Sequence, residues 1–186
     1  MKVYNFSPGP AKLDSSIISK SQEAMYNFQN TGLSILEIGH RSKEFEKLMN
    51  SLQENIRNIF NVPTNYFTLF LQGGATFQNT FIANNFDMRD KDLGCLVTGT
   101  WGKSTFDDFS KIRETKLIEL SQDEIENFVE SGEDLKNVDY LHLTSNETIN
   151  GVQLREFNKI NHDSLLIDMS SDIGSYRFEW DNIAYI

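Results

Sequence analysis

The sequence contains a single cysteine, Cys95, among its 186 residues. One thiol cannot form an internal disulfide, so a reducing compartment is the simplest expectation. The N-terminal residues contain no apolar stretch of the kind that directs secretion, and no segment approaches the roughly 18 consecutive apolar residues of a membrane-spanning helix. These absences predict a cytoplasmic protein without a membrane contact.

Basic residues are also scarce. Lys and Arg number 17 against 27 Asp and Glu, which gives a formal net charge of −10. A protein that binds a nucleic-acid backbone needs clustered positive charge, and no basic run here exceeds two residues. We therefore expect no nucleic-acid partner. The hydrophobic fraction of 39% is sufficient for one domain with a real core.

What the sequence does contain is an alternation of helical and strand patterns. The helical segments are residues 13–28, 44–60 and 75–85, with further helices after 99–104 and after 121–124; the strand segments are 66–71, 93–98, 117–120, 138–143, 164–168 and 183–186. Strands that alternate with helices are typical of an α/β domain with a largely parallel sheet.

Two glycines, Gly73 and Gly74, separate the apolar run 66–71 from a helical segment. Such a turn allows the backbone to approach a ligand closely, and the first N–H groups of the following helix attract an anion, typically a phosphate. Ala75 and Thr76 stand at that helix start, and Thr76 adds a hydroxyl donor. Most Gly-Gly pairs between a strand and a helix are only turns, so both interpretations are open at this point.

Further polar residues follow other predicted strands, and ligands of parallel sheets bind beyond the carboxyl ends of the strands. Trp101 either fills the core or forms a flat wall for a ring. Asp168 either caps a helix or holds a positive charge on a ligand. Arg41, beside His40, either lies in solvent or clamps a carboxylate or phosphate.

Two other site types are excluded. The three histidines lack the spacing of metal ligands, so no metal site is expected. The tripeptide Gly102-Lys103-Ser104 is similar to the end of a nucleotide-binding P-loop, but that motif requires a glycine where Val97 stands.

A phosphate cradle, an aromatic wall and a carboxylate at one sheet edge suit a phosphorylated aromatic cation. Pyridoxal 5′-phosphate (PLP) is such a ligand. A carboxylate beside its pyridine nitrogen keeps that nitrogen protonated, which makes the ring an electron sink.

Six segments together resemble the phosphoserine aminotransferases, a family of class V PLP-dependent aminotransferases. They are Asn5-Phe6-Ser7-Pro8-Gly9-Pro10-Ala11, Gly39-His40-Arg41-Ser42-Lys43-Glu44-Phe45, Gln72-Gly73-Gly74-Ala75-Thr76-Phe77-Gln78, Gly99-Thr100-Trp101, Asn146-Glu147-Thr148-Ile149-Asn150-Gly151 and Asp168-Met169-Ser170-Ser171. The segments occur in the family's order over essentially the whole chain.

The resemblance implies the PLP-dependent transferase fold of the aspartate aminotransferase type (fold type I). Residues 1–186 would form a single incomplete large domain, including a lead-in at 1–15, without the C-terminal small domain. Members of the family are homodimers. They convert O-phospho-L-serine and 2-oxoglutarate to 3-phosphooxypyruvate and L-glutamate in serine biosynthesis.

The resemblance also implies roles for individual residues. Ala75 and Thr76 would bind the PLP phosphate, and Trp101 would stack on the ring. Thr148 would hydrogen-bond on the 3-hydroxyl side, and Asp168 would pair with the pyridine nitrogen. Arg41 and His40 would hold a substrate carboxylate or phosphate.

The family's Schiff-base lysine has no counterpart in this chain, so no catalytic residue is assigned. The expectation is therefore a truncated fragment without activity of its own. Two alternatives are a non-catalytic remnant that retains PLP binding or dimerisation, and another class V enzyme such as an alanine–glyoxylate aminotransferase.

Overall fold

The computed structural model describes residues 3–7, 9–85, 91–131, 135 and 137–186. The chain divides into two compact units, Met1–Thr68 and Leu69–Ile186. The expectation of one incomplete domain over residues 1–186 stays a prediction.

The first unit contains helices α1 (Ser15–Tyr26) and α2 (Lys43–Phe60), which confirm the two predicted helices. Asp14 caps α1, because its side chain accepts a hydrogen bond of 2.8 Å from the backbone N–H of Ser16. Two 3₁₀ turns that the sequence analysis did not anticipate, η1 (Phe28–Asn30) and η2 (Ile35–Glu37), lie between these helices.

Helix α2 ends as its sequence predicts. Asn61 adopts a left-handed conformation (φ +50°), which closes the helix before Pro63. The guanidinium group of Arg57, in the last turn, donates to the carbonyls of Pro63 and Tyr66 and so holds the chain that leaves the helix.

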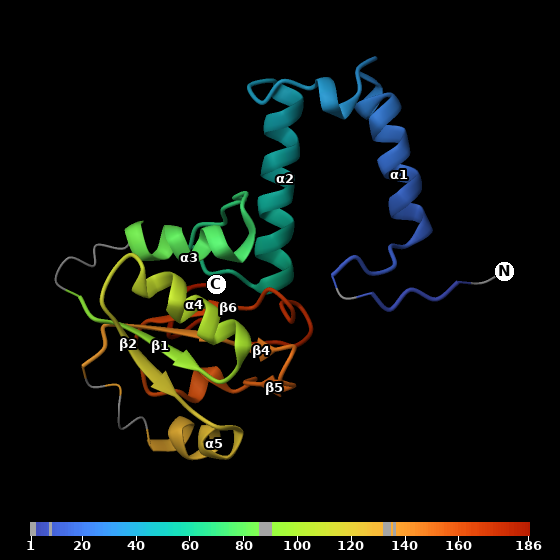
Figure 1. Ribbon diagram of the computed structural model, residues 1–186. Coiled ribbons are helices and arrows are strands. Elements are labelled where there is room, and N and C mark those ends of the chain that lie inside the picture. The colour runs from blue at the N-terminus through green and yellow to red at the C-terminus, as the bar shows by residue number, and fades with distance from the viewer. Residues whose placement is uncertain (1–2, 8, 86–90, 132–134, 136) are drawn as a thin grey trace. The chain divides into compact units, whose positions relative to one another are not determined.

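The second unit is built on a five-stranded sheet in the order β2-β1-β3-β6-β7 (Figure 1). The strands are β1 (Leu93–Val97), β2 (Thr115–Glu119), β3 (Tyr140–Thr144), β6 (Leu165–Asp168) and β7 (Ile183–Tyr185). Each pair of neighbours is parallel. The predicted α/β fold with a mostly parallel sheet is confirmed.

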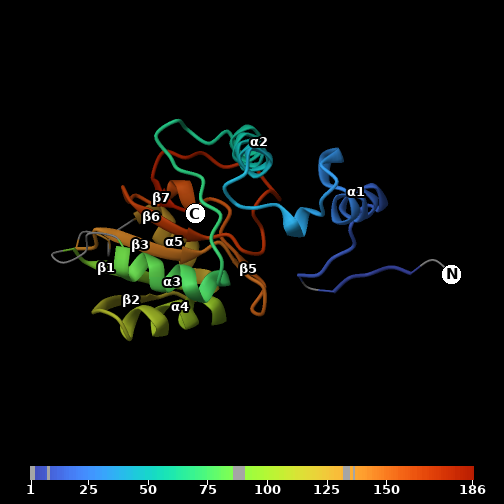
Figure 2. The same ribbon diagram turned by 90° about the horizontal axis from the view of Figure 1, so that it is seen from above.

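Helices cover both faces of this sheet. Helices α3 (Gly74–Asn85) and α4 (Thr100–Ser110) pack on one face, and α5 (Gln122–Ser131) packs on the other (Figure 1). Figure 2 shows α3 and α4 side by side. The 3₁₀ turn η4 (Phe157–Lys159) contacts α5. A small antiparallel hairpin, β4 (Asn146–Glu147) with β5 (Val152–Gln153), follows β3.

The strand predicted over 66–71 is wrong: these residues form no strand in the structure. The segment is rich in aromatic and aliphatic residues, which favour strands, but a strand also requires a neighbouring edge with which to form a ladder. The side chain of Phe67 is 90% exposed, and those of Leu69, Phe70 and Leu71 are exposed as well. Composition therefore gave the wrong local structure here.

His142 lies in the middle of β3, fully buried beneath α4. Its ring packs edge-on against Phe109 (5.3 Å between centroids), and its Nδ1 lies 3.8 Å from the Sγ of Cys95. Burial lowers the pKa of His142 to about 4, against the opposing attraction of the Asp168 carboxylate. Burial, with the nearby Glu147 carboxylate, raises the pKa of Cys95 to about 12, so this thiol is not a nucleophile.

We expect His142 to make the chain sensitive to acid. The unfolded imidazole takes up a proton below about pH 6.5, whereas the folded one resists until about pH 4, so protons favour unfolding between these values. As the pH is lowered from about 6.5 to about 4, the free energy of unfolding should decrease. This group contributes up to about 1.4 kcal/mol per pH unit to the decrease.

Urea unfolding of the H142F variant at several pH values tests this expectation. The variant should lose stability less steeply than the parent chain between pH 6.5 and 4. The control variant His40→Gln retains His142 and should keep the parental slope. An unchanged slope in His142→Phe would contradict the assignment.

Candidate functional site

Three polar segments meet at the carboxyl edge of the parallel sheet. Trp101 follows β1 in the first turn of α4, Thr148 follows β3 in the β4–β5 hairpin, and Asp168 ends β6. Because β1, β3 and β6 are adjacent and parallel, their carboxyl ends lie at the same edge. The predicted clustering of these strand ends is confirmed.

Trp101 and Thr148 are joined directly. The indole Nε1 of Trp101 donates to the hydroxyl of Thr148 over 2.8 Å. Trp101 is 45% exposed, so it does not serve as core filler. Since the Thr148 oxygen accepts this hydrogen bond, its own hydrogen is available to donate to a further group. The pair thus presents an aromatic surface beside a hydroxyl donor.

Asp168 is half-buried at the end of β6, where its Oδ1 accepts from the backbone N–H of Ser170 (2.9 Å). Its register partner on β3 is Thr144. The Thr144 side chain is only 6% exposed, and within the described part of the chain its Oγ1 has no hydrogen-bond partner. A buried hydroxyl without a partner is unfavourable, which indicates that this part of the edge is built to face another polar group.

The glycine pair forms the turn that the sequence predicts. Gly73 and Gly74 both have positive φ (+103° and +62°), and helix α3 begins at Gly74. A Cβ on Gly73 would lie 2.5 Å from the Cβ of Phe77, so only glycine fits. Ala75 and Thr76 are exposed in the first turn of α3, where helical N–H groups lack intrahelical partners.

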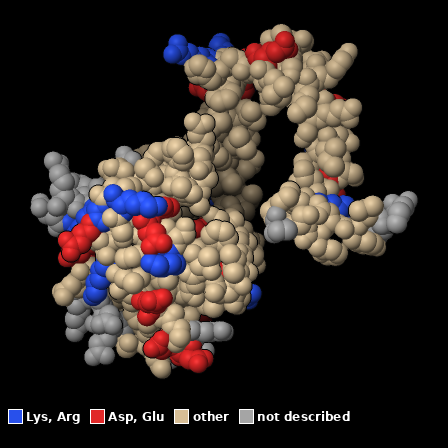
Figure 3. All heavy atoms as spheres, in the orientation of Figure 1, with Lys and Arg blue, Asp and Glu red and all other residues tan. Residues whose placement is uncertain are grey.

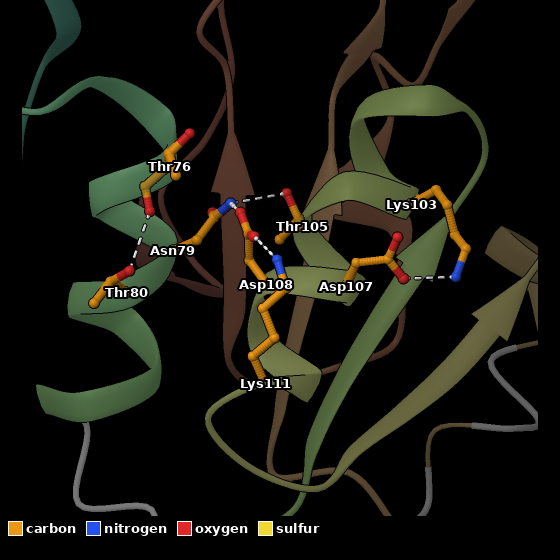
Figure 4. A network of polar contacts seen from close by, with 8 residues as sticks. All are labelled: Thr76, Asn79, Thr80, Lys103, Thr105, Asp107, Asp108 and Lys111. Atoms are coloured by element: carbon orange, nitrogen blue, oxygen red, sulfur yellow. Dashed lines mark hydrogen bonds and ion pairs between the residues drawn. The ribbon is translucent and has the colours of Figure 1, made fainter.

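A buried amide that sequence reasoning missed holds α3 against α4 (Figure 4). The Nδ2 of Asn79 lies 3.3 Å from both the Oγ1 of Thr105 and the Oδ2 of Asp108. Asn79 stands one helical turn after Ala75, so these bonds fix the glycine turn relative to the helix that carries Trp101. An Asn within an apolar helical face was the available signal.

Asp172 is a second residue that the sequence analysis did not single out. Its buried carboxylate accepts from the Ser145 hydroxyl (2.6 Å), the Gln153 amide (3.1 Å) and the Tyr176 hydroxyl (3.2 Å). These bonds join the segment after β6 to the β4–β5 hairpin. Asp172 therefore holds the loop that follows Asp168 next to the loop that carries Thr148.

His40 and Arg41 lie in the Met1–Thr68 unit. They occupy the centre of a turn closed by a 2.9 Å hydrogen bond from the Ser42 N–H to the Gly39 carbonyl, and both are exposed. Ser42 then caps α2 by accepting from the N–H of Phe45. The role of His40 and Arg41 in substrate binding stays a prediction.

Other site types were also sought. In the described ranges, no group of three His, Cys, Asp or Glu side chains is arranged to hold a metal ion. No helix among those same residues is long and apolar enough to cross a membrane. On the face of the Leu69–Ile186 unit seen in Figure 3, Lys and Arg lie interspersed with Asp and Glu. Gly102, Lys103 and Ser104 lie inside α4, not in a phosphate loop.

The model of the family "Aminotransferase class-V" matches residues 3–184. This chain belongs to the class-V aminotransferase family. A phosphoserine aminotransferase of Geobacillus kaustophilus is 38% identical over 189 residues, which cover 100% of this chain and 52% of that relative. One of Herpetosiphon aurantiacus is 37% identical, with 96% and 51% covered. The chain spans about half the length of the curated relatives it matches.

Solved structures support the same family. Phosphoserine aminotransferase from Bacillus circulans subsp. alkalophilus superposes with a TM-score of 0.83 at 34% identity, over 98% of this chain and 51% of that one. The PLP-bound phosphoserine aminotransferase from Trichomonas vaginalis gives 0.81 at 29% identity, over 98% and 55%. The expected fold type I architecture is confirmed. An alanine–glyoxylate aminotransferase from Nostoc sp. (TM-score 0.55, 18% identity, 87% and 41% covered) shares the fold alone.

We expect Asn79→Ala to destabilise the Leu69–Ile186 unit by about 1–3 kcal/mol, because it leaves the buried hydroxyl of Thr105 and the half-buried carboxylate of Asp108 without this donor. Urea denaturation measures the loss. The matched control is Thr80→Ala, one residue along on the exposed side of α3, which should change stability by less than about 0.5 kcal/mol. Equal effects of the two substitutions would contradict the clamp between the helices.

Proposed function

We propose that this chain forms the PLP-binding half of a PLP-dependent phosphoserine aminotransferase. The whole enzyme would convert O-phospho-L-serine and 2-oxoglutarate to 3-phosphooxypyruvate and L-glutamate in serine biosynthesis. The observation that carries the proposal is the carboxyl edge of the sheet, where Asp168 ends β6 and the hydrogen-bonded Trp101–Thr148 pair follows β1 and β3. The glycine turn at the start of α3 adds exposed N–H groups. The phosphoserine aminotransferase relatives support the choice of substrate.

The residues present fit PLP. The buried Thr144 hydroxyl beside Asp168 could form a hydrogen bond with a polar group of the cofactor. The exposed start of α3, with its glycine turn, suits a phosphate. Trp101 offers an exposed aromatic surface of the kind that a pyridine ring stacks on.

Each side chain then has a definite task. The N–H groups and hydroxyl at Ala75 and Thr76 would bind the phosphate, and Trp101 would stack against the ring. Thr148 would donate its hydroxyl hydrogen to the 3-oxygen, and Asp168 would hold the proton on the pyridine nitrogen. When bound, PLP supplies the electron sink that stabilises a carbanion at the substrate's α-carbon.

The remaining assignments are part of the same proposal. Arg41 and His40 would hold a substrate carboxylate or phosphate, which a guanidinium group does bidentately. The full-length protein would act as a homodimer in the cytoplasm. Because the lysine that family members attach to PLP has no counterpart in the sequence, the 186 residues by themselves would bind PLP without transaminating.

Titration of the chain with PLP, followed by the cofactor's absorbance, tests the binding site. We expect reversible binding, without a borohydride-stable bond to any lysine of the chain. Asp168→Ala should weaken binding by tenfold or more, because a charge-assisted hydrogen bond contributes roughly 1.5–3 kcal/mol.

The matched control is Asp163→Ala, which removes an exposed carboxylate two residues before β6 begins and should leave PLP affinity unchanged. Equal affinity of the Asp168→Ala variant and the parent chain would refute the role of Asp168. A trapped lysine adduct would refute the absence of an attachment lysine. In a longer protein that contains this chain, Asp168→Ala should remove most turnover of phosphoserine.

A further inference from the structure

We propose that Glu147 is the positioning residue that places both Trp101 and Thr148 in the cofactor site, by capping helix α4 from outside that helix. The inference rests on the proposed function, because it gives these two side chains a cofactor to meet. None of the roles derived from the sequence falls on Glu147.

The side chain of Glu147 is completely buried, with 0% exposed. Its Oε2 accepts the backbone N–H of Trp101 over 2.8 Å, and its Oε1 accepts the backbone N–H of Gly102 over 2.7 Å. A carboxylate that accepts two N–H groups at the start of a helix also faces the positive end of the helix dipole. Both oxygens of Glu147 are thus committed to α4.

Asn150 completes the cap. Its Oδ1 accepts the N–H of Thr100 over 2.9 Å and the Thr100 hydroxyl over 3.0 Å. The residue at the N-cap position of α4, Gly99, has no side chain that can perform this task. A Cβ there would lie 2.6 Å from the Oδ1 of Asn150 and 2.8 Å from the Cδ of Glu147. Glycine at this position therefore admits the two capping side chains.

The main chain of Glu147 positions Thr148. Glu147 pairs with Val152 in the β4–β5 hairpin, and its carbonyl accepts the N–H of Gly151 over 2.8 Å. The turn closed by that bond carries Thr148. Glu147 therefore positions the start of α4, with Trp101, through its side chain, and Thr148 through its main chain. The hydrogen bond between Trp101 and Thr148 then links the two side chains.

A carboxylate is required for this role. Glutamine in the same place has one acceptor oxygen, so its NH₂ group would face a backbone N–H, and both would be donors. Glu147→Gln should release one of the two N–H groups and loosen the first turn of α4. Trp101 and Thr148 would then sample orientations that do not match a bound ring.

Hydrogen exchange in the absence of PLP tests the cap itself. In Glu147→Gln, the amides of Trp101 and Gly102 should exchange about tenfold faster relative to the core amides of β3, since the loss of a charge-assisted bond is concentrated there. Glu156→Gln, which removes an exposed carboxylate from an ion pair with Lys159, is the control and should leave these rates unchanged.

A double-mutant cycle on PLP affinity tests positioning. Glu147→Gln should weaken PLP binding about tenfold in the parent chain and much less in a Trp101→Ala background, where no indole remains to be placed. If Glu147→Gln does not fold, Asn150→Ala replaces it in the cycle, because this variant removes only the exposed part of the cap. It should weaken PLP binding less than tenfold in the parent chain, and less again in the Trp101→Ala background.

The outcomes separate the two proposals. Equal weakening of PLP binding by Glu147→Gln in both backgrounds, or unchanged exchange at Trp101 and Gly102, would overturn the positioning role. Faster exchange at these amides in a chain that does not bind PLP at all would support the placement of Trp101 by Glu147 and overturn the proposed function.

Discussion

The parallel alignment of β1, β3 and β6 is the constraint on which the candidate site depends. The inner residues of these strands are buried, so their side chains belong to the core and are not available for binding a ligand. The residues available to a ligand are those that end a strand, such as Asp168, or follow one. Because the strands run in the same direction, three segments distant in sequence deliver Trp101, Thr148 and Asp168 to one edge. The residues of the candidate site therefore lie at the strand ends and in the segments that connect the strands.

Those connections are held by buried polar groups whose hydrogen bonds are satisfied. Asp172 accepts three donors, Glu147 accepts two, and Asn79 donates to α4. Each joins two elements that come from different parts of the chain. Thr144 differs from them, because its buried hydroxyl is left without a partner among the described residues. Thr144 therefore marks the position along this edge at which a buried hydroxyl can still form a hydrogen bond.

Much of this architecture follows from the sequence, and what fails does so for physical reasons. The strands and helices of the second unit could be predicted because a strand buried on both faces has a continuous apolar run, and an amphipathic helix has apolar residues at helical spacing. The segment 66–71 was predicted wrongly, because a strand depends on a neighbouring edge that composition does not reveal. Trp101 and Asp168 stood out because they lie at the ends of apolar runs, and the role of Thr148 came from the resemblance to the family.

The supporting residues could not be found in the same way. Glu147 and Asn79 act through partners 45 to 46 and 26 to 29 positions away, and nothing in their local sequence distinguishes a buried acceptor from a solvated one. Gly99 carries no clearer signal, since glycine is an ordinary residue at the start of a helix. Its reason became clear only when the side chains that occupy the space were placed.

The capping of α4 also explains why a phosphate would bind at the N-terminus of α3 and not at that of α4. Two long helices begin near this sheet edge, and either N-terminus would attract an anion if nothing else occupied it. The carboxylate of Glu147 already occupies the N–H groups of Trp101 and Gly102, and a second negative charge beside it would be repelled. The start of α3 has a glycine turn with exposed Ala75 and Thr76 and no such carboxylate bonded to it in the described residues. Under the proposed function, one buried glutamate would thus hold Trp101 in place and leave the start of α3 as the site for the phosphate.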